Sequence, residues 1–355
     1  MPDPRVLKNI GEAVDRLITV DVSSRGLIGV LYDAARTSLD GQPLALTAAE
    51  RLWAATTPGQ PVVIATGLPI RGWFSPAMAE NDGPIGAATL ARAVYLARGA
   101  LPVLICETEQ VAVLEACVRA ASLTPTTFEQ IELAAASPHA VPGRALPVAV
   151  VHGFPADDRA AVEESRRLLA RKPSALVSIE RQGANAKGVY HYGRGEANRR
   201  DIMAKVDLLF EEARAAGVLT IGIGDGGNEL GMGRIKDAVR QHVPFGGKCA
   251  CPCGAGMAPE MVPDVLITAT VSNWGAWGIE ACLAALAEDL HVLHSPDMEL
   301  EAIRACAAAG AVDGATGLVE PFVDALPARI CAHLVEVLQT IVRNGLNPPA
   351  LFRMA

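Results

Sequence analysis

The sequence predicts an α/β fold of three layers, in which helices cover both faces of a mainly parallel sheet. Short apolar runs of strand length alternate with longer segments of helical periodicity, a pattern typical of parallel βαβ units. Most of these runs end in glycine or polar residues, as strands of such sheets do. Half of the 355 residues are hydrophobic and few are aromatic, so the chain can bury a large aliphatic core.

The first 60 residues carry helical rather than strand patterns. Apolar residues recur at helical spacing over residues 6–18, 26–36 and 47–55, and Thr47 with Glu50 fits a capping box at the start of the third helix. We therefore expect residues 1–60 to form an N-terminal helical extension. Residues 61–355 would form an α/β/α domain, and the whole chain would fold as a single domain.

From residue 61 onward, predicted strands and helices alternate. We expect strands at 61–65, 103–106, 148–151, 175–179, 218–223 and 265–271. Helices are expected at 86–98, 109–121, 157–170, 200–216, 276–290 and 326–342, with a further helix starting near residue 230. Consecutive parallel strands of this kind are joined by right-handed crossovers.

Charge and hydropathy exclude several classes of protein. The net charge is −8, the pI is near 5.5 and no basic stripe is present, which argues against a nucleic-acid partner. No apolar run reaches the length of a membrane span, and the N-terminus lacks the pattern of a secretory signal, so we expect a cytoplasmic protein without a membrane partner. The positive mean hydropathy favours a homo-oligomer.

The stretch TIGIGDGGNELGMG at 220–233 is the strongest candidate for a functional site. It combines a buried strand, a glycine-rich turn and an expected helix, which is how open α/β sheets build ligand crevices. Asp225 alone could be a helix N-cap, but Asn228 and Glu229 follow among several glycines, which favours function. The two carboxylates would repel a pyrophosphate, so no nucleotide cofactor is expected.

Polar residues follow several predicted strands, and the carboxyl ends of parallel strands share one edge of the sheet. Residues distant in sequence are therefore expected to converge on one crevice. Glu180 next to Arg181 could equally be a surface ion pair, and Asp82 and Asp313 could be turn residues. The candidate substrate-binding residues are Thr66, Gly67, Asp82, Arg181, Gly224, Gly226, Gly227, Asn228, Ser272 and Asn273.

The chemistry of these residues suits a small anionic or zwitterionic substrate. Glu180, Asp225 and Glu229 are candidate catalytic residues, and their oxygens could also bind a divalent metal such as Mg²⁺, Mn²⁺ or Ca²⁺. A helix N-terminus together with Arg181 could hold a carboxylate or phosphate. A metal-dependent phosphohydrolase acting on a small phosphorylated metabolite and a non-catalytic small-molecule-binding protein remain alternatives.

Cys249, Cys251 and Cys253 form the one sequence motif that suggests zinc. Their alternate spacing departs from the usual C-x₂-C pairs, and no histidine pair at ligand spacing accompanies them. We therefore expect a loop of small residues near the sheet edge. His152 and His191 are single histidines and are expected to be structural.

Several motifs resemble the D-glutamate cyclase family, in particular its C-terminal domain type. The resemblance rests on the glycine string at 220–233, on VSNWGAWGIEA at 271–281, on SIERQG at 178–183, and on ATGLPI and ENDGPIGA at 65–70 and 80–87. It covers about residues 62–317. A member of this family is expected to be a hydro-lyase that converts D-glutamate to 5-oxo-D-proline and water.

The resemblance also suggests roles for individual residues. Asp225 or Glu229 would act as base or metal ligand, and Glu180 would be a second acidic group. Arg181, Asn228 and Asn273 would orient the substrate carboxylates. The backbone N–H groups of the glycines at 224, 226 and 227 would approach the substrate closely.

Overall fold

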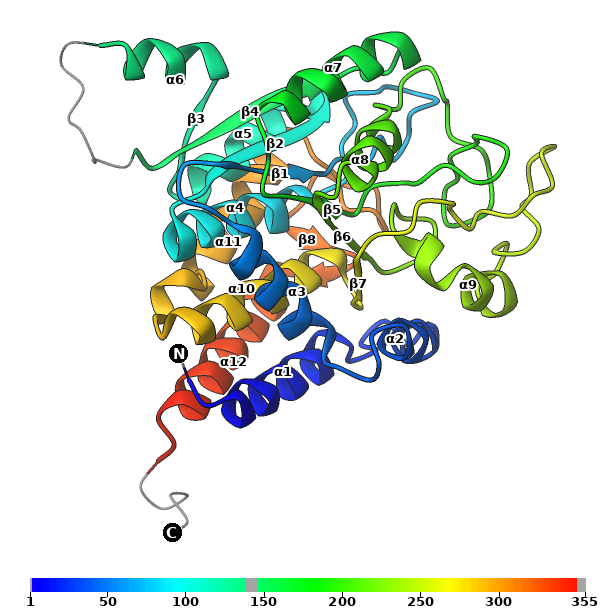
Figure 1. Ribbon diagram of the computed structural model, residues 1–355. Coiled ribbons are helices and arrows are strands. Elements are labelled where there is room, and N and C mark those ends of the chain that lie inside the picture. Colours follow the sequence, from blue (N-terminus) through cyan, green and yellow to red (C-terminus); the bar gives the residue numbers. More distant parts are fainter. Residues whose placement is uncertain (1, 138–145, 350–355) are drawn as a thin grey trace.

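Seven parallel strands form the central sheet of the computed structural model, which describes residues 2–137 and 146–349 (Figure 1). Their order across the sheet is β3-β4-β2-β1-β5-β6-β7. The strands are β1 (Pro61–Ala65), β2 (Leu101–Glu107), β3 (Thr124–Thr126), β4 (Val148–Phe154), β5 (Ala175–Ile179), β6 (Leu219–Gly224) and β7 (Val265–Thr268). With helices on both faces, the predicted three-layer α/β/α fold is confirmed.

The strand order reverses direction between β1 and β5. From β1 the chain moves to β2, β3 and β4 on one side, and it then returns to place β5 against the other edge of β1. In open parallel sheets, ligands bind beside such a reversal, beyond the carboxyl ends of the strands. The topology therefore favours a site near the ends of β1, β5 and β6.

Side-chain alternation along the strands divides the core in two. Val62 and Ile64 of β1 face a large apolar cluster, and Val63 and Ala65 face a smaller one. On the first face lie α4 (Pro84–Arg98), α5 (Val111–Ala120) and α10 (Ser272–Ala287). On the second lie α7 (Asp158–Ala170) and α8 (Val206–Ala215).

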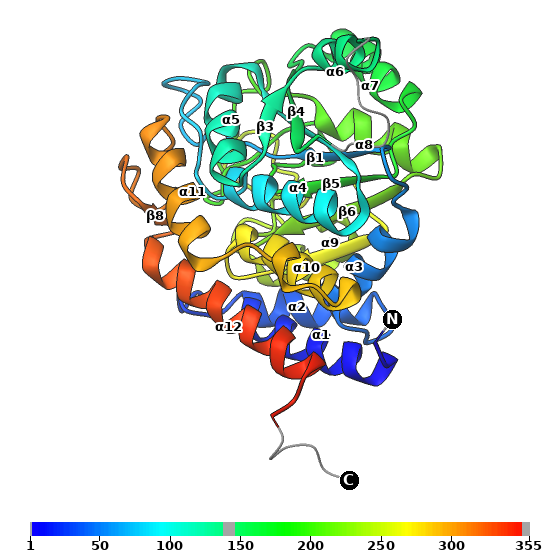
Figure 2. The ribbon, with the colours of Figure 1, turned by 90° about the vertical axis from the view of Figure 1, so that its left-hand side faces the viewer.

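A second helical layer covers α10, which is buried along almost its whole length. The helices of this layer that pack on α10 are α1 (Pro4–Ile18), α3 (Leu44–Ala55) and α12 (Ala328–Leu346). Beside them, α2 (Ile28–Thr37) packs on β7, and α11 (Pro296–Ala308) packs on α4, α5 and α12. These helices contribute to the same apolar cluster as the first face of the sheet. Helices α1 and α12 pack together and lie side by side in both views (Figures 1 and 2). Among the described helices, none has the length and apolar character needed to cross a membrane.

The structure corrects the prediction at the start of the third helix. Helix α3 begins at Leu44, because the buried carboxylate of Asp15 in α1 accepts hydrogen bonds from the backbone N–H groups of Leu44 (2.6 Å) and Ala45 (3.0 Å). Thr47 caps nothing, since its hydroxyl donates to the carbonyl of Pro43 within the same helix. The capping box was therefore wrong, and a carboxylate from another helix replaces it.

Several short elements were not predicted. They are β3, α6 (Phe128–Ala135), α9 (Lys236–His242) and a two-stranded hairpin of β8 (Phe322–Val323) and β9 (Leu326–Pro327). Helix α8 also begins six residues later than expected, at Val206. The hairpin is important for function, because its turn places Asp324 at the candidate site.

Candidate active site

A cavity of about 940 Å³ lies beyond the carboxyl ends of β5 and β6. Its walls come from the segment between α1 and α2, the residues following β1, the long segment after β5, the glycine loop after β6 and the β8–β9 hairpin. The lining includes the acidic residues Glu80, Glu180, Glu196, Asp225 and Asp324 and the basic residues Arg25, Arg71 and Arg194. Carboxylates from four different segments therefore share one space.

Glu180 and Asp225 follow directly after the adjacent strands β5 and β6, so the sheet itself brings them together. Both are buried. Glu180 has a φ of +45°, a left-handed conformation that is uncommon for a residue other than glycine and that concentrates at functional sites. The hydroxyl of Ser272 donates to a Glu180 oxygen at 2.5 Å and so fixes its direction.

The glycine loop after β6 wraps around its own carboxylate. One Glu229 oxygen accepts the backbone N–H groups of Asp225 (3.2 Å) and Gly226 (2.6 Å), and the other accepts that of Gly227 (2.7 Å). A Cβ at Gly224 would lie only 2.7 Å from the Cβ of Glu229, so glycine is required there. These N–H groups therefore hold Glu229, whereas the sequence suggested that they approach the substrate.

The helix expected near residue 230 does not follow the glycine loop, which is a correction to the sequence prediction. Leu230 instead donates its N–H to the carbonyl of Arg181, and Gly231 adopts a φ of +112°. Only a 3₁₀ turn, η2 (Met232–Ile235), and the short α9 come next. The glycine loop consequently presents no helix N-terminus to an anion.

Arg25, from the segment between α1 and α2, is the cation at the centre of the acidic cavity. Its guanidinium forms an ion pair with Asp225 and donates to the carbonyl of Thr270 at 3.1 Å. Asp21 shapes this segment by accepting the backbone N–H groups of Arg25 (3.1 Å) and Gly26 (2.6 Å). Asp225 mainly, together with Asp324 and Glu229, raises the pKa of Arg25 although its side chain is partly removed from solvent, so the side chain stays charged.

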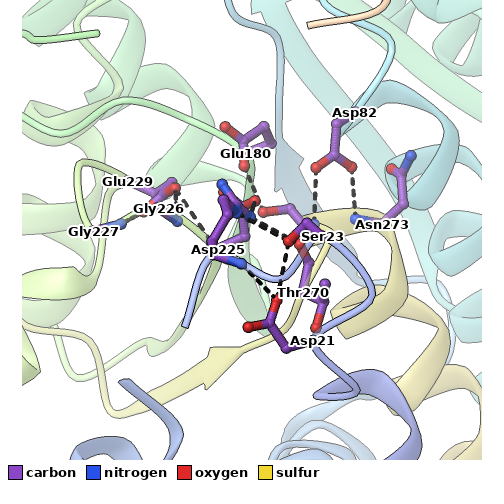
Figure 3. Close-up of polar contacts among 12 residues, drawn as sticks. Asp21, Ser23, Asp82, Glu180, Asp225, Gly226, Gly227, Glu229, Thr270 and Asn273 are labelled. Carbon is purple, nitrogen blue, oxygen red and sulfur yellow. Dashed lines mark hydrogen bonds and ion pairs between the residues drawn. The ribbon is translucent and has the colours of Figure 1, made fainter. Parts of the chain in front are cut away.

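Asp82 and Asn273 hold two helix N-termini together. The Asp82 carboxylate accepts the backbone N–H groups of Ser272 and Asn273, both at 2.8 Å, at the start of α10. In return, the Asn273 side-chain oxygen accepts the N–H groups of Gly83 (2.9 Å) and Gly86 (2.7 Å), at the start of α4. Figure 3 shows the Asp82 carboxylate directed at the backbone of Asn273. This reciprocal capping sets the wall behind Glu180, and neither side chain lines the cavity.

Arg181 points away from the cavity, in contrast to the role suggested by the sequence. Its guanidinium is fully buried and contacts both oxygens of Glu107, at 2.5 and 2.6 Å. It also donates to the carbonyls of Gly67 (2.7 Å) and Ala204 (2.8 Å). Thr66 and Gly67 likewise lie beneath the cavity and do not line it. Arg181 therefore ties β2, β5 and the turn after β1 together.

Burial and mutual repulsion raise the pKa values of several carboxyl groups at the site. Burial and the neighbouring Asp225 raise the pKa of Glu229 to about 8. The same two causes raise the pKa of Asp82 to about 7, against the opposing effect of its backbone hydrogen bonds. The pKa of Glu180 is well above its ordinary value, through burial first and then Asp225 and Glu229. Burial and neighbouring acids also raise the pKa values of Glu80 and Asp324.

Four important residues of the cavity were not selected from the sequence. Arg25, Arg71 and Arg194 lie in segments without regular structure, where single arginines carry no recognisable pattern. Asp324 occupies a two-residue hairpin turn, and both turn residues, Asp324 (φ +51°) and Ala325 (φ +62°), are left-handed as in type I′ turns. The only sequence feature that could have predicted this turn is the short segment FVDALP.

Two groups of side chains have the arrangement of metal ligands among the described residues. Ligand atoms of Glu180, Asp225 and Glu229 all lie within 4.8 Å of one another; Glu180 and Asp225 line the cavity, and the buried Glu229 does not. The second group consists of His191, Cys249, Cys251 and Cys253. The cysteines occupy a loop, as expected, but they converge there on a histidine from a distant segment.

The fold and the site define an α/β protein with an acidic cavity at the carboxyl edge of a parallel sheet. The D-glutamate cyclase-like, C-terminal family matches residues 14–339, and the chain belongs to this family, which confirms the resemblance seen in the sequence. The human protein "D-glutamate cyclase, mitochondrial" is 34% identical over 175 residues, which are 48% of this chain and 25% of the human protein. The match thus spans about a quarter of that relative's length.

Proposed function

We propose that the chain catalyses the cyclisation of D-glutamate to 5-oxo-D-proline and water in the acidic cavity. The amine nitrogen forms a bond to the γ-carboxyl carbon, and one C–O bond of that carboxyl group breaks. The ammonium group loses two protons, and the departing oxygen takes up two to leave as water. The reaction therefore needs groups that move protons from nitrogen to oxygen, with no net gain or loss of protons.

The observation that carries this proposal is the pairing of Glu180 with Asp225 at adjacent strand ends in the cavity. Burial and the neighbouring acids raise the pKa of Glu180, which favours its protonated form and makes it the candidate to donate a proton to the γ-carboxylate. Asp225 is paired with the permanently charged Arg25 and is the candidate to accept a proton from the ammonium group. A neighbouring acid and base with different surroundings are typical of proton-transfer sites. The family membership and the human relative support the same reaction.

Arginines around the cavity replace Arg181 as candidates for binding the two substrate carboxylates. Arg71 and Arg194 line the cavity, and Arg194 is exposed. Arg25 stands beside Asp225 within it. A guanidinium binds a carboxylate through two parallel hydrogen bonds, which fixes orientation as well as charge.

A divalent cation fits the acidic group in the cavity. Glu180, Asp225 and Glu229 offer carboxylate oxygens, the ligands that Mg²⁺, Mn²⁺ and Ca²⁺ prefer. Each carboxylate oxygen has two lone pairs, so Glu229 can keep its backbone hydrogen bonds and still contribute a ligand. Such a cation would take the place of the protons that the raised pKa values favour on Glu180 and Glu229, and Glu180 would then be a ligand rather than the proton donor. When bound, such a cation would stabilise negative charge on the γ-carboxyl oxygens.

The test is an assay for 5-oxoproline with purified protein and D- or L-glutamate. The protein is treated with a chelator and then supplied with Mg²⁺, Mn²⁺ or Ca²⁺ in separate reactions. We expect product from D-glutamate, and a fall of 10²–10⁴-fold for Asp225→Asn, the range lost with a general acid or base. Asp237→Asn, at an exposed position of α9, is the matched control and should retain activity. If no 5-oxoproline forms from either enantiomer with any of the metals, the proposal is wrong.

A further inference from the structure

Four potential zinc ligands meet behind the wall of the acidic cavity. Cys249, Cys251 and Cys253 lie on one loop, and His191 lies on the segment that follows β5. The Cys249 sulfur is 3.5 Å from that of Cys251 and 3.3 Å from that of Cys253. The Nε2 atom of His191 is 3.3 Å from the Cys251 sulfur and 3.7 Å from the Cys253 sulfur.

These separations are those of the corners of a metal-centred tetrahedron. Bonds of about 2.3 Å to sulfur and about 2.0–2.1 Å to nitrogen give sulfur–sulfur edges of roughly 3.8 Å and sulfur–nitrogen edges of roughly 3.6 Å. The observed contacts agree with these edges to within about 0.5 Å. A disulfide does not account for the cluster, because all three cysteines are free.

The surroundings of the cluster are also those of a metal site. The side-chain amide of Asn185 donates to the Cys253 sulfur at 3.4 Å and to the carbonyl of Gly256 at 2.6 Å. Donors of this kind stabilise thiolate ligands and fix their direction. A Cβ at Gly256 would lie 2.1 Å from the carbonyl oxygen of Gly246, so only glycine lets the cysteine loop close here.

We propose that His191, Cys249, Cys251 and Cys253 bind one Zn²⁺ ion in a closed, structural Cys₃His site. Thiolate and imidazole ligands select zinc over the hard cations suggested for the acidic group. Four protein ligands leave no position for a substrate, and none of the four lines the cavity. The site is therefore separate from the proposed catalytic centre and does not depend on the proposed reaction.

The role of this site is to fasten the wall of the cavity to the rest of the molecule. His191 is followed by Tyr192, Gly193, Arg194 and Glu196, which line the cavity. The cysteine loop also holds this segment directly, since Ala250 donates its N–H to the carbonyl of Gly195 at 3.0 Å. The amide of Asn228 in the glycine loop donates to the carbonyl of His191 at 2.8 Å. Zinc would thus link the wall to the loop that carries Asp225.

The first experiment measures metal in the full chain purified under reducing conditions from zinc-supplemented cells. We expect one zinc per chain by inductively coupled plasma mass spectrometry. Replacement of zinc by Co²⁺ should give the intense visible bands of tetrahedral cobalt and the near-ultraviolet charge-transfer band of thiolate ligands. Wild-type protein with reduced thiols and far less than one zinc per chain, or a weak octahedral cobalt spectrum, would overturn the proposal.

Variants then assign the ligands. Cys251→Ser and His191→Ala should reduce the zinc content from one per chain to nearly none under dialysis against a mild chelator. Cys282→Ala, in the buried α10, and His242→Ala, at an exposed position, are the matched controls and should keep the metal. Asp225→Asn should also keep it, which separates this site from the acidic one. If the ligand variants are insoluble, the zinc content and the cobalt spectrum of the wild-type protein test the proposed site. Soluble ligand variants that keep one zinc per chain would refute the assignment of these residues as ligands.

Discussion

Removing the guanidinium of Arg181 should unfold the protein more readily without weakening its contact with substrate. Arg181 and Glu107 are each only 1% exposed and are joined by two short hydrogen bonds. Arg181→Met leaves the Glu107 carboxylate buried without its counter-charge, and it also removes the partners of the carbonyls of Gly67 and Ala204. Loss of one partner of a buried ion pair costs about 3–5 kcal/mol.

This cost can be converted to a shift in melting temperature. An unfolding entropy of roughly 2.1 cal/mol/K per residue gives about 0.75 kcal/mol/K for 355 residues. Arg181→Met should therefore lower Tm by about 4–7 °C in differential scanning calorimetry. The control Arg214→Met, at an exposed position of α8, should change stability by no more than about 0.5 kcal/mol.

A double variant separates the two roles considered for Arg181. The Glu107→Met/Arg181→Met protein removes both charges, and its Tm should lie closer to wild type than that of Arg181→Met alone, because no buried charge is left unpaired. The KM for D-glutamate of folded Arg181→Met should equal that of wild type. An unchanged Tm combined with a raised KM would refute the structural role and restore the one suggested by the sequence.

Two further predictions concern charge. Arg25→Gln removes the cation paired with Asp225 and a candidate partner of the substrate carboxylates, so kcat/KM for D-glutamate should fall; an unchanged kcat/KM, measured against the exposed control Arg16→Gln, would contradict a role for the ion pair. Burial lowers the pKa of His294, but Glu280 and Glu299, at 2.7 and 3.2 Å, outweigh it and raise this pKa to about 9. The folded pKa exceeds the ordinary value, so this stabilisation is complete below about pH 6.5 and is lost as pH rises to 9. Urea unfolding of wild type and His294→Gln should differ by about 3 kcal/mol less at pH 9.5 than at pH 6, and a difference independent of pH would show that His294 is not charged.

Much of the sheet could be predicted because its strands are buried on both faces. The strands at 61–65 and 175–179 have the expected bounds, since each is a short apolar run between residues that break strands. The convergence of Glu180 and Asp225 also follows from topology, because both terminate parallel strands. Strand β3 has no such signal, since TPT at the sheet edge is only partly buried and contains proline.

The site was less predictable because side-chain partners come from distant segments. Asn273 was predicted from its place after a strand and Asp82 from a glycine loop, yet only the packing of α4 against α10 turns them into reciprocal caps. Arg181 follows Glu180 directly in the sequence but points away from the cavity, where it forms an ion pair with Glu107 of β2. The cysteine loop needed His191 to become a candidate metal site, and sequence spacing alone cannot supply a ligand from so far away.

The cyclisation of D-glutamate in the acidic cavity is the central proposal for this protein. The most direct measurement is the rate of 5-oxoproline formation from D-glutamate by metal-reconstituted wild type, Asp225→Asn and Asp237→Asn, compared in one experiment. Wild type and Asp237→Asn should both form 5-oxoproline, and the rate should fall 10²–10⁴-fold in Asp225→Asn. Equal turnover by all three proteins would place catalysis elsewhere, and no turnover by wild type with any of the metals would contradict the claim itself.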